Sequence, residues 1–285
     1  MPLMKITIAS GCGFCSGVKR AIKLAEDCAE NDKEVYTLGP LIHNLQVVQR
    51  LEEKGVKAVD SIDKILSGTV LFRSHGVKPE DFIKAEKKHL KVIDGTCPIV
   101  SRVQRLAEKL TEEGYSVVIV GDPNHPEVEG IVSRARDAIV VRGPDEAKRI
   151  RRKRLGIIAQ TTQTLSNLRA VVSQVMETAS EIKVYNTICK AVLRLQESSC
   201  KLAESVDILL VVGGVSSANT KRLFLLAKGI NPNTYHIEGK GDMRLEWLHQ
   251  REKIGITAGT STPSWVIDEV VEEIKTKCRV IKNSS

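Results

Sequence analysis

Two hydrophobic patterns alternate along the whole chain. Short continuous apolar runs, typical of buried strands, alternate with longer stretches in which apolar residues recur at helical spacing. The stretch that begins at Pro98 shows the helical pattern, with apolar residues at Val100, Val103, Leu106, Ala107 and Leu110. Alternating strands and helices of this kind indicate parallel sheets joined by βαβ crossovers. The pattern therefore predicts an α/β fold.

A cysteine stands between a strand and a helix at three places in the chain. The strand–cysteine–helix stretches contain Cys15, Cys97 and Cys189, which are 82 and 92 residues apart. A thiol at the amino end of a helix meets the positive end of the helix dipole, which favours the thiolate that binds metals. The spacing indicates a repeat of whole lobes. We predict α/β lobes at residues 15–96, 97–188 and 189–285.

The repeat continues within each lobe. A second apolar strand leads, 28 residues after each cysteine, to His43, His125 and Ser217. A later strand ends on further polar groups, which are Arg73-Ser74-His75-Gly76, Gln160-Thr161-Thr162 and Gly259-Thr260-Ser261. Ligands of parallel sheets bind outside the carboxyl ends of the strands, which is where these groups fall. Lobes facing a common axis would bring three thiols together, among histidines, hydroxyls and a carboxylate.

Length and composition exclude some classes of protein. The chain has 285 residues, is 42% hydrophobic and has no apolar run of about 18 residues, so we predict no membrane span. Residues 1–5 lack the form of a signal peptide and lead into the first strand, so we predict a cytoplasmic protein. Seven cysteines, an odd number, then point to metal or redox chemistry for some of them.

The net charge of the chain indicates which kinds of ligand or partner it can bind. The net charge of +8 suits an anionic small ligand, an acidic protein or nucleic acid. The densest basic cluster, residues 149–154, ends a helical pattern, where cations ordinarily complement the helix dipole. Aromatic residues make up 4% of the chain and do not interleave with this cluster, so we do not expect a stacking surface for nucleic acid.

We expect different roles for the seven cysteines. Cys28, Cys200 and Cys278 lie within helical patterns and are interpreted as packing residues. Cys12 and Cys15 form a Cys-x-x-Cys pair of the kind seen in thioredoxin-like redox proteins. The repeat favours Cys15 as a metal ligand and Cys12 as a neighbouring residue that does not bind the metal.

Three thiolates suit either of two metal centres. Zinc takes three protein ligands and a water in catalytic sites, whereas a 4Fe-4S cluster held by three cysteines keeps one iron open. Widely separated single cysteines favour the larger cluster. Around it, the histidines, Ser217, Asn219, Ser261 and Thr161 would form a phosphate pocket. Glu127, two residues after His125, is the carboxylate placed for proton transfer.

The polar groups at the strand ends belong to eight short motifs that follow one another along nearly the whole chain. They are Gly13-Phe14-Cys15-Ser16-Gly17-Val18, Leu41-Ile42-His43-Asn44, Arg73-Ser74-His75-Gly76, Thr96-Cys97-Pro98, Asn124-His125-Pro126-Glu127-Val128-Glu129-Gly130, Gln160-Thr161-Thr162, Asn186-Thr187-Ile188-Cys189 and Thr257-Ala258-Gly259-Thr260-Ser261. With these motifs in this order, the sequence resembles the family of 4-hydroxy-3-methylbut-2-enyl diphosphate reductases, Fe-S enzymes that catalyse the last step of the non-mevalonate isoprenoid pathway.

The resemblance implies three similar parallel-sheet lobes in a pseudo-threefold arrangement around a central cluster, with the N-terminal strand region, residues 1–14, packed on the third lobe. It implies one 4Fe-4S cluster with an open iron, bound by Cys15, Cys97 and Cys189. It implies Glu127 as the catalytic acid, oriented by Thr161. The implied substrate-binding residues are His43, His75, His125, Thr161, Ser217, Ala218, Asn219 and Ser261.

The implied activity removes the allylic hydroxyl of the diphosphate substrate and gives isopentenyl and dimethylallyl diphosphate and water. Ferredoxin or flavodoxin would deliver the electrons, and a basic surface suits such acidic carriers. Neither nucleic acid nor a membrane is an expected partner. The chain departs from the family pattern in two places. Ala218 stands where the family often has Ser or Gly. After Cys189, Val192 and Leu195 stand where the family usually has Thr and Arg.

Two functions from other classes remain open at this point. One is a zinc hydrolase that acts on a phosphorylated substrate with Glu127 as its base. A colourless protein that holds one zinc ion would favour this function. The other is a redox-sensing Fe-S protein without turnover that binds nucleic acid through the basic cluster, which salt-dependent retention of DNA or RNA would favour.

Overall fold

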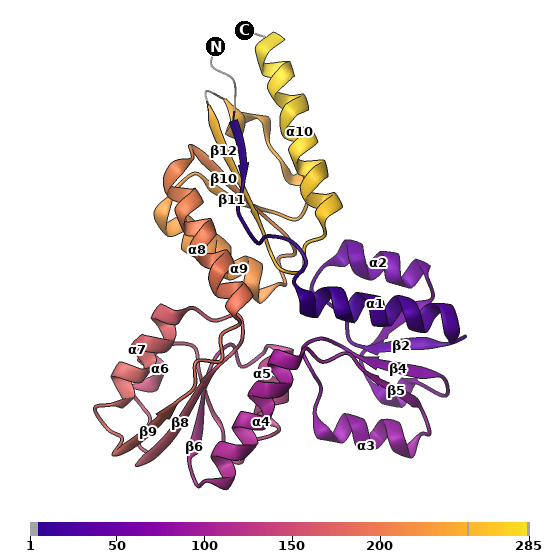
Figure 1. The fold of residues 1–285 in the computed structure, drawn as a ribbon, viewed down its shortest axis with the longest axis vertical. Coiled ribbons are helices and arrows are strands. Elements are labelled where there is room, and N and C mark those ends of the chain that lie inside the picture. The colour runs from indigo at the N-terminus through magenta and orange to yellow at the C-terminus, as the bar shows by residue number, and fades with distance from the viewer. Residues whose placement is uncertain (1–4, 250, 284–285) are drawn as a thin grey trace. The chain divides into compact units, whose positions relative to one another are not determined.

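The computed structural model of the chain describes residues 5–249 and 251–283. These residues contain three parallel four-stranded sheets, with strand orders β3-β2-β4-β5, β7-β6-β8-β9 and β11-β10-β12-β1 (Figure 1). The structure therefore confirms the predicted α/β class with parallel sheets. Residues 1–4, at the start of the N-terminal strand region predicted over 1–14, and residues 250, 284 and 285 of the last predicted lobe lie outside the described residues.

The first sheet is built from the first third of the chain. Its strands are β2 (Val35–Leu38), β3 (Val56–Val59), β4 (Thr69–Phe72) and β5 (Lys91–Asp94). The helices of this part are α1 (Ser16–Asn31), α2 (Leu45–Glu53), the short 3-10 helix η1 (Ile62–Lys64) and α3 (Pro79–Lys87).

The second sheet repeats this order with the next part of the chain. Its strands are β6 (Ser116–Val120), β7 (Ile139–Val141), β8 (Arg154–Ala159) and β9 (Glu181–Val184). Its helices are α4 (Pro98–Glu112), α5 (Pro126–Val132), α6 (Pro144–Ala147) and α7 (Leu165–Val175). Pro98 occupies the first turn of α4, where its missing N–H costs nothing, as the sequence predicts.

The third sheet takes its fourth strand from the other end of the chain. Its strands are β10 (Ile208–Val212), β11 (Thr234–Ile237), β12 (Lys253–Ala258) and β1 (Lys5–Ile8), and β1 pairs in parallel with β12. Its helices are α8 (Lys190–Ser205), α9 (Ala218–Ile230), the 3-10 helices η2 (Lys240–Asp242) and η3 (Leu245–Leu248), and α10 (Ser264–Asn283). Thus β1 occupies the edge position that β5 and β9 occupy in the other two sheets.

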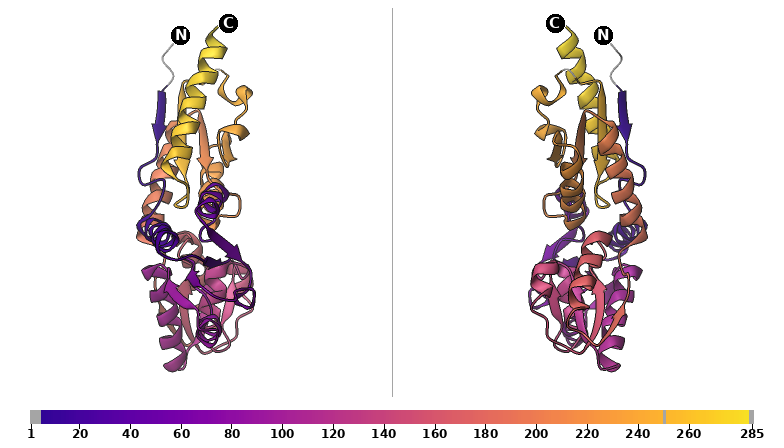
Figure 2. Two further views of the ribbon diagram at one scale, coloured as in Figure 1. Left: turned by 90° about the vertical axis from the view of Figure 1, so that its right-hand side faces the viewer. Right: turned by 90° about the vertical axis from the view of Figure 1, so that its left-hand side faces the viewer.

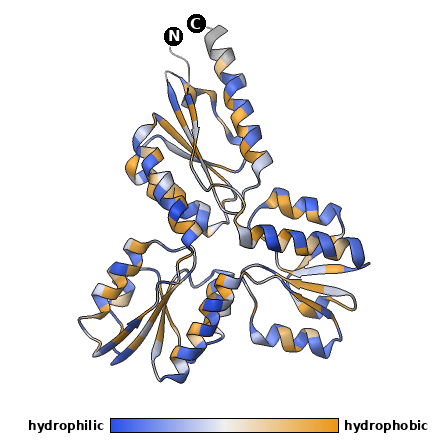
Figure 3. Cartoon of the chain, in the orientation of Figure 1, coloured by the Kyte–Doolittle hydropathy of each residue, from blue (hydrophilic) through white to orange (hydrophobic). Residues whose placement is uncertain are grey.

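Helices bury both faces of the third sheet at its inner strand β10, which explains why this strand is apolar at every position. Ile208, Leu210 and Val212 pack with residues of α10, whereas Leu209 and Val211 face α8 and α9. Successive strand residues point to opposite faces, so two covered faces require a continuous apolar run. Figure 2 shows α10 along one side of these strands, and Figure 3 shows the apolar strands and the striped helices.

Between the second and last strands of each lobe, the sequence also predicts one more short strand and helix, at residues 56–66, 138–150 and 234–248, and the helix part of this prediction is only partly correct. The second sheet has a short α-helix there, α6, whereas the first and third sheets have the 3-10 helices η1, η2 and η3. Within residues 5–249 and 251–283, no helix is both long enough and apolar enough for a membrane crossing.

The chain divides into two compact units. The first contains residues 1–16, 43–47 and 190–285, and includes the third sheet. The second contains residues 17–42 and 48–189, and includes the first two sheets. The division into three lobes at residues 97 and 189, and their arrangement around a common centre, stay predictions.

Candidate active site

Cys15, Cys97 and Cys189 have the same local setting in the three sheets. Each follows the edge strand of one sheet, β1, β5 or β9, and the next residue begins a helix, α1, α4 or α8. In each case the cysteine N–H donates to the carbonyl of the second residue after a neighbouring strand. These bonds are Cys15 to Thr260 at 3.2 Å, Cys97 to Ser74 at 3.0 Å and Cys189 to Thr161 at 2.9 Å. All three thiols are partly exposed and in no disulfide.

The other cysteines are less suited to bind a metal. Burial raises the pKa of the Cys12, Cys28 and Cys200 thiols, which disfavours the thiolate form that a metal needs. Cys12 also packs against the apolar core of the third sheet, and Cys278 is part of that core. This setting supports the interpretation of Cys12 as a neighbour of the predicted ligand Cys15.

A residue that the sequence reasoning missed supports the segment before Cys97. The Arg20 guanidinium donates to the carbonyl oxygens of Thr96 and Asp94, at 3.1 Å each. The Asp94 carboxylate also accepts the Thr96 N–H at 2.9 Å. In the sequence Arg20 looks like any basic residue of an amphipathic helix, so no local pattern marks this contact.

The segment before Cys189 is held in a different way. The Thr187 hydroxyl accepts the Ala159 N–H at 2.8 Å and donates to the Ala159 carbonyl at 2.6 Å. Thr187 is buried, so both bonds are sheltered from water. They connect the end of β8 to the residues that lead into the cysteine.

Glu127 is a buried carboxylate held on both oxygens by one residue. Thr161 donates its N–H to one oxygen at 2.7 Å and its hydroxyl to the other at 2.8 Å. Burial raises the pKa of Glu127, and the two bonds from Thr161 oppose this shift. Because the Thr161 carbonyl accepts the Cys189 N–H, a single residue links the acid to a cysteine.

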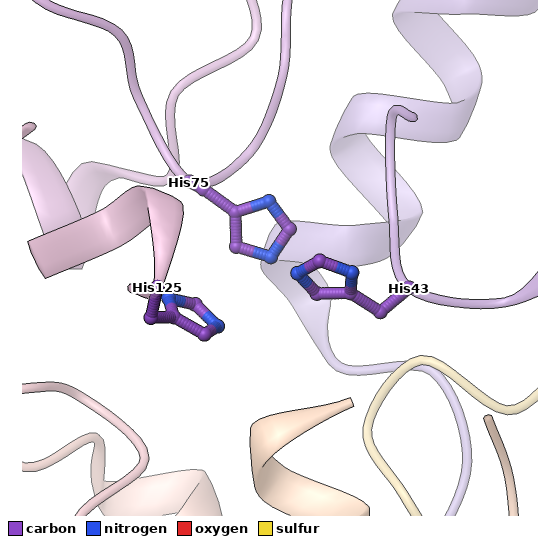
Figure 4. A group of neighbouring side chains, drawn as sticks. All are labelled: His43, His75 and His125. Atoms are coloured by element: carbon purple, nitrogen blue, oxygen red, sulfur yellow. The ribbon is translucent and has the colours of Figure 1, made fainter. Parts of the chain in front are cut away.

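His125 and His75 lie side by side in the same unit. Their rings meet edge to face with centroids 5.4 Å apart (Figure 4). His125 caps α5, and its Nδ1 accepts the Glu127 N–H at 3.2 Å. With Nδ1 acting as acceptor, the neutral ring carries its proton on Nε2. His125 is therefore set to donate from Nε2.

The predicted phosphate-binding groups of the other unit meet at the start of α9. Ser217 caps this helix, with its oxygen accepting the Thr220 N–H at 3.3 Å. The Ser261 hydroxyl donates to the His43 carbonyl at 3.4 Å and lies 3.5 Å from the Ser217 oxygen. Ala218 is the first residue of α9 and adds only its backbone.

Within this group, Asn219 has a buried side-chain amide that a bound ligand could satisfy. Its side chain is 3% exposed, and neither its Nδ2 nor its Oδ1 has a hydrogen-bond partner among the described residues. A buried amide without partners is costly. The amide and the first backbone N–H groups of α9 together suit an anion.

The repeat is less regular here than the spacing suggests. His125 and Ser217 are both helix caps, but α2 begins at Leu45 and the side chain of Asn44 accepts the Val47 N–H at 3.1 Å. Asn44 therefore caps α2, and His43 lies one residue before the cap.

The structure distributes the predicted site residues between the two units. Cys15, His43, Ser217, Ala218, Asn219 and Ser261 belong to the first unit. His75, Cys97, His125, Glu127, Thr161 and Cys189 belong to the second. At the departures after Cys189, Val192 and Leu195 are buried, and Leu195 packs with Val211 and Leu223, so apolar side chains suit these positions.

A model of the family described as LytB protein matches residues 6–275. The chain belongs to the LytB family. Two curated relatives, from Geobacter metallireducens and Geobacter sulfurreducens, are each 46% identical over 274 residues, covering 95% of this chain and 97% of theirs. Both are named 4-hydroxy-3-methylbut-2-enyl diphosphate reductase. These matches confirm the resemblance seen in the sequence.

Solved structures agree with this membership. One is a structure of (E)-4-hydroxy-3-methyl-but-2-enyl diphosphate reductase, the terminal enzyme of the non-mevalonate pathway. It is 44% identical, covers 96% of this chain and 100% of its own, and has a TM-score of 0.68. Another is a structure of the corresponding reductase from Plasmodium falciparum, which is 26% identical. The match covers 95% of this chain and 88% of that one, with a TM-score of 0.90.

Proposed function

We propose that this protein is a 4-hydroxy-3-methylbut-2-enyl diphosphate reductase. The reaction adds two electrons and two protons to the substrate, breaks its allylic C–O bond, and gives isopentenyl or dimethylallyl diphosphate and water. The observation that carries the proposal is the contact chain from Glu127 through Thr161 to Cys189. It joins an acid able to protonate a leaving hydroxyl to a candidate cluster ligand.

Cys15, Cys97 and Cys189 would hold one 4Fe-4S cluster with one iron left open. Their matching positions and partly exposed thiols fit this role, since each sheet offers one equivalent donor. When bound, such a cluster supplies single electrons and a Lewis-acidic iron for the hydroxyl oxygen.

The residues of the chain bind the diphosphate. His43, Ser217, Asn219 and Ser261 offer donors on one unit, and His75 and His125 offer donors on the other. Asn219 supports this role most directly, because its buried amide otherwise has no partner among the described residues. Binding energy from the diphosphate would hold the carbon chain in position for reaction.

Glu127 would deliver the proton to the leaving hydroxyl. A raised pKa keeps a carboxylic acid protonated at a higher pH than usual, which suits a general acid near neutral pH. The Thr161 hydroxyl positions the carboxyl group and can pass on its proton. A ferredoxin or flavodoxin would supply the electrons, and the net charge of +8 favours such acidic carriers. A cytoplasmic location completes the proposal.

Glu127→Gln tests the acid. The variant keeps the shape of the site but has no proton to give, so turnover with a strong chemical reductant should fall by about a hundredfold to ten-thousandfold. Its visible spectrum and substrate binding should match those of the wild type. The chemical reductant bypasses the protein carrier, so a docking defect cannot explain a loss. Wild-type turnover by this variant, with its spectrum unchanged, would require a different proton donor.

Serine substitution tests the cluster ligands separately. Cys15→Ser, Cys97→Ser and Cys189→Ser should each strongly reduce the iron and sulfide content of anaerobically purified protein. Cys12→Ser is the matched control and should keep the wild-type content, because burial already disfavours the Cys12 thiolate. Full iron loading in Cys97→Ser would remove Cys97 from the ligand set.

A further inference from the structure

A pocket outside the proposed reaction centre contains Arg73, whose Nε has no hydrogen-bond partner among the described residues. The pocket lies in the second unit, has a volume of about 270 Å³, and is lined by Arg73, Gly76, Lys78, Lys84, Glu129 and Gly130 among others. Arg73 follows directly after β4, at the carboxyl end where parallel sheets bind ligands. None of the residues proposed above to bind the cluster or the diphosphate lines this pocket.

The fold makes room for the Arg73 guanidinium. Gly39, in the turn after β2, has φ of +71°, and a Cβ atom there would lie 2.5 Å from Nη1 of Arg73. Gly39 therefore meets two requirements, a left-handed backbone and close contact with the arginine. The close contact places the Arg73 guanidinium against the turn after β2.

The Arg73 guanidinium has no counterion in contact within the part of the chain that the structure describes. Nε of Arg73 is buried without a hydrogen-bond partner, and no carboxylate oxygen of the described residues forms a salt bridge with the side chain. Burial lowers the pKa of Arg73, while the more distant charges of Glu129 and Asp81 raise it. A buried guanidinium N–H without a hydrogen-bond partner is unfavourable, and a ligand that accepts its hydrogen bond would remove this cost.

The carboxylates around the pocket are engaged with other groups. Glu129 lies 3.7 Å from the Lys78 ammonium, and Asp60 lies 2.8 Å from that of Lys64. Asp81 accepts the Lys78 N–H at 3.2 Å. Lys84, whose ammonium lies 3.9 Å from Asp63, is a third cation of the lining beside Arg73 and Lys78.

We propose that this pocket is a second anion-binding site, for a small oxyanion of the phosphate type that Arg73 binds through its guanidinium fork. The five N–H donors of a guanidinium match phosphate oxygens in a bidentate arrangement, and the charge strengthens each bond. The buried side chains of Leu38, Ile62 and Val77 add apolar walls, so the pocket also accepts a short organic group attached to the phosphate. The site is independent of the proposed reductase activity.

Titration calorimetry of the full-length protein with inorganic phosphate, at constant ionic strength, tests the site. To remove the contribution of the proposed substrate site, the titration uses the Ser217→Ala/Asn219→Ala background. Phosphate should still bind there, and adding Arg73→Met should weaken binding by about tenfold or more. Arg73→Lys keeps the charge but loses the fork, and should also weaken binding.

Arg105→Met is the matched control. Arg105 is an exposed arginine of α4, so this change removes the same charge without touching the pocket, and phosphate binding should stay unchanged. Circular dichroism checks that each variant is folded. Binding that survives both Arg73 variants, or that falls equally in Arg105→Met, overturns the proposal. Loss of all phosphate binding in the Ser217/Asn219 background also overturns it, while leaving the proposed substrate site intact.

Discussion

Glu127 shows how a residue with an ordinary sequence setting acquires unusual chemistry. A glutamate in the first turn of a helix is common and usually exposed. Here α5 places it 2% exposed, with both carboxylate oxygens held by Thr161. Burial alone would favour the protonated form, and the Thr161 donors limit that preference. The acid is thus buried enough to retain a proton and still held in one orientation.

This burial predicts how stability depends on pH. The pKa of Glu127 is raised in the folded protein, so its contribution is present at low pH and is lost as pH rises from its ordinary value of 4.5 through the raised value. Glu127→Gln cannot ionise. The free energy of unfolding of this variant relative to the wild type should therefore increase with pH, by up to about 1.4 kcal/mol per unit within that window.

Urea unfolding of both proteins between about pH 5 and 8 measures this difference. The groups common to both proteins cancel in the comparison. A difference that stays constant with pH would show that Glu127 ionises alike in the folded and unfolded chain.

At the scale of elements, close packing around the ends of strands leaves no room for side chains at certain glycines. Gly259 follows β12, and a Cβ atom there would collide with the hydroxyl of Thr220, which is buried in α9. Gly229, near the end of the same helix, has nothing within 4 Å of its Cβ position. One glycine is required by contact between elements, and the other is not.

The two glycines give a matched pair of predictions. Gly259→Ala should lower the free energy of unfolding by about 1–3 kcal/mol, because Thr220 and the loop that carries Ser261 must move apart. Gly229→Ala should raise it by about 0.4–1 kcal/mol, since alanine restricts the unfolded chain and favours the helix. Thermal and urea unfolding measure both values. Equal effects of the two changes would contradict the packing at Gly259.

For the whole molecule, the notable feature is that the first strand completes the sheet built from the last part of the chain. The N–H groups of Lys5 and Ala9 donate to the carbonyls of Glu252 and Ile256, at 2.7 and 2.8 Å. Because strand residues alternate in direction, the Thr7 N–H also faces β12, whereas that of Ile8 faces away. The third sheet therefore requires the chain ends to pair across the whole sequence.

Proline substitutions in β1 test this pairing. Thr7→Pro removes an N–H that points into the ladder and should destabilise the third sheet by about 1–3 kcal/mol. Ile8→Pro is the control, since Ile8 is 46% exposed and its N–H points away from β12, so its effect should be smaller. Hydrogen exchange of the β12 amides reads out the local effect. Stronger deprotection by Ile8→Pro would reverse the register inferred here.

The sequence by itself determined the order of strands and helices and the position of each cysteine between them. These features follow from periodicity, which depends on residues a few positions apart, so they can be read locally. The helix after Cys97 and its first-turn proline are confirmed where the spacing predicts them. The recurring motifs, together with the family resemblance, also sufficed to name the site residues, whose roles stay predictions.

Only the tertiary structure decided the contacts between distant segments. The bonds from Arg20 to the residues before Cys97, and the pocket around Arg73, join residues whose own neighbours along the chain look ordinary. The structure also has the 3-10 helices η1, η2 and η3 where the sequence predicts short helices in the first and third lobes. The physical reason is common to all these cases: burial, pKa and unpaired charge depend on what packs against a residue, and local spacing does not encode its partners.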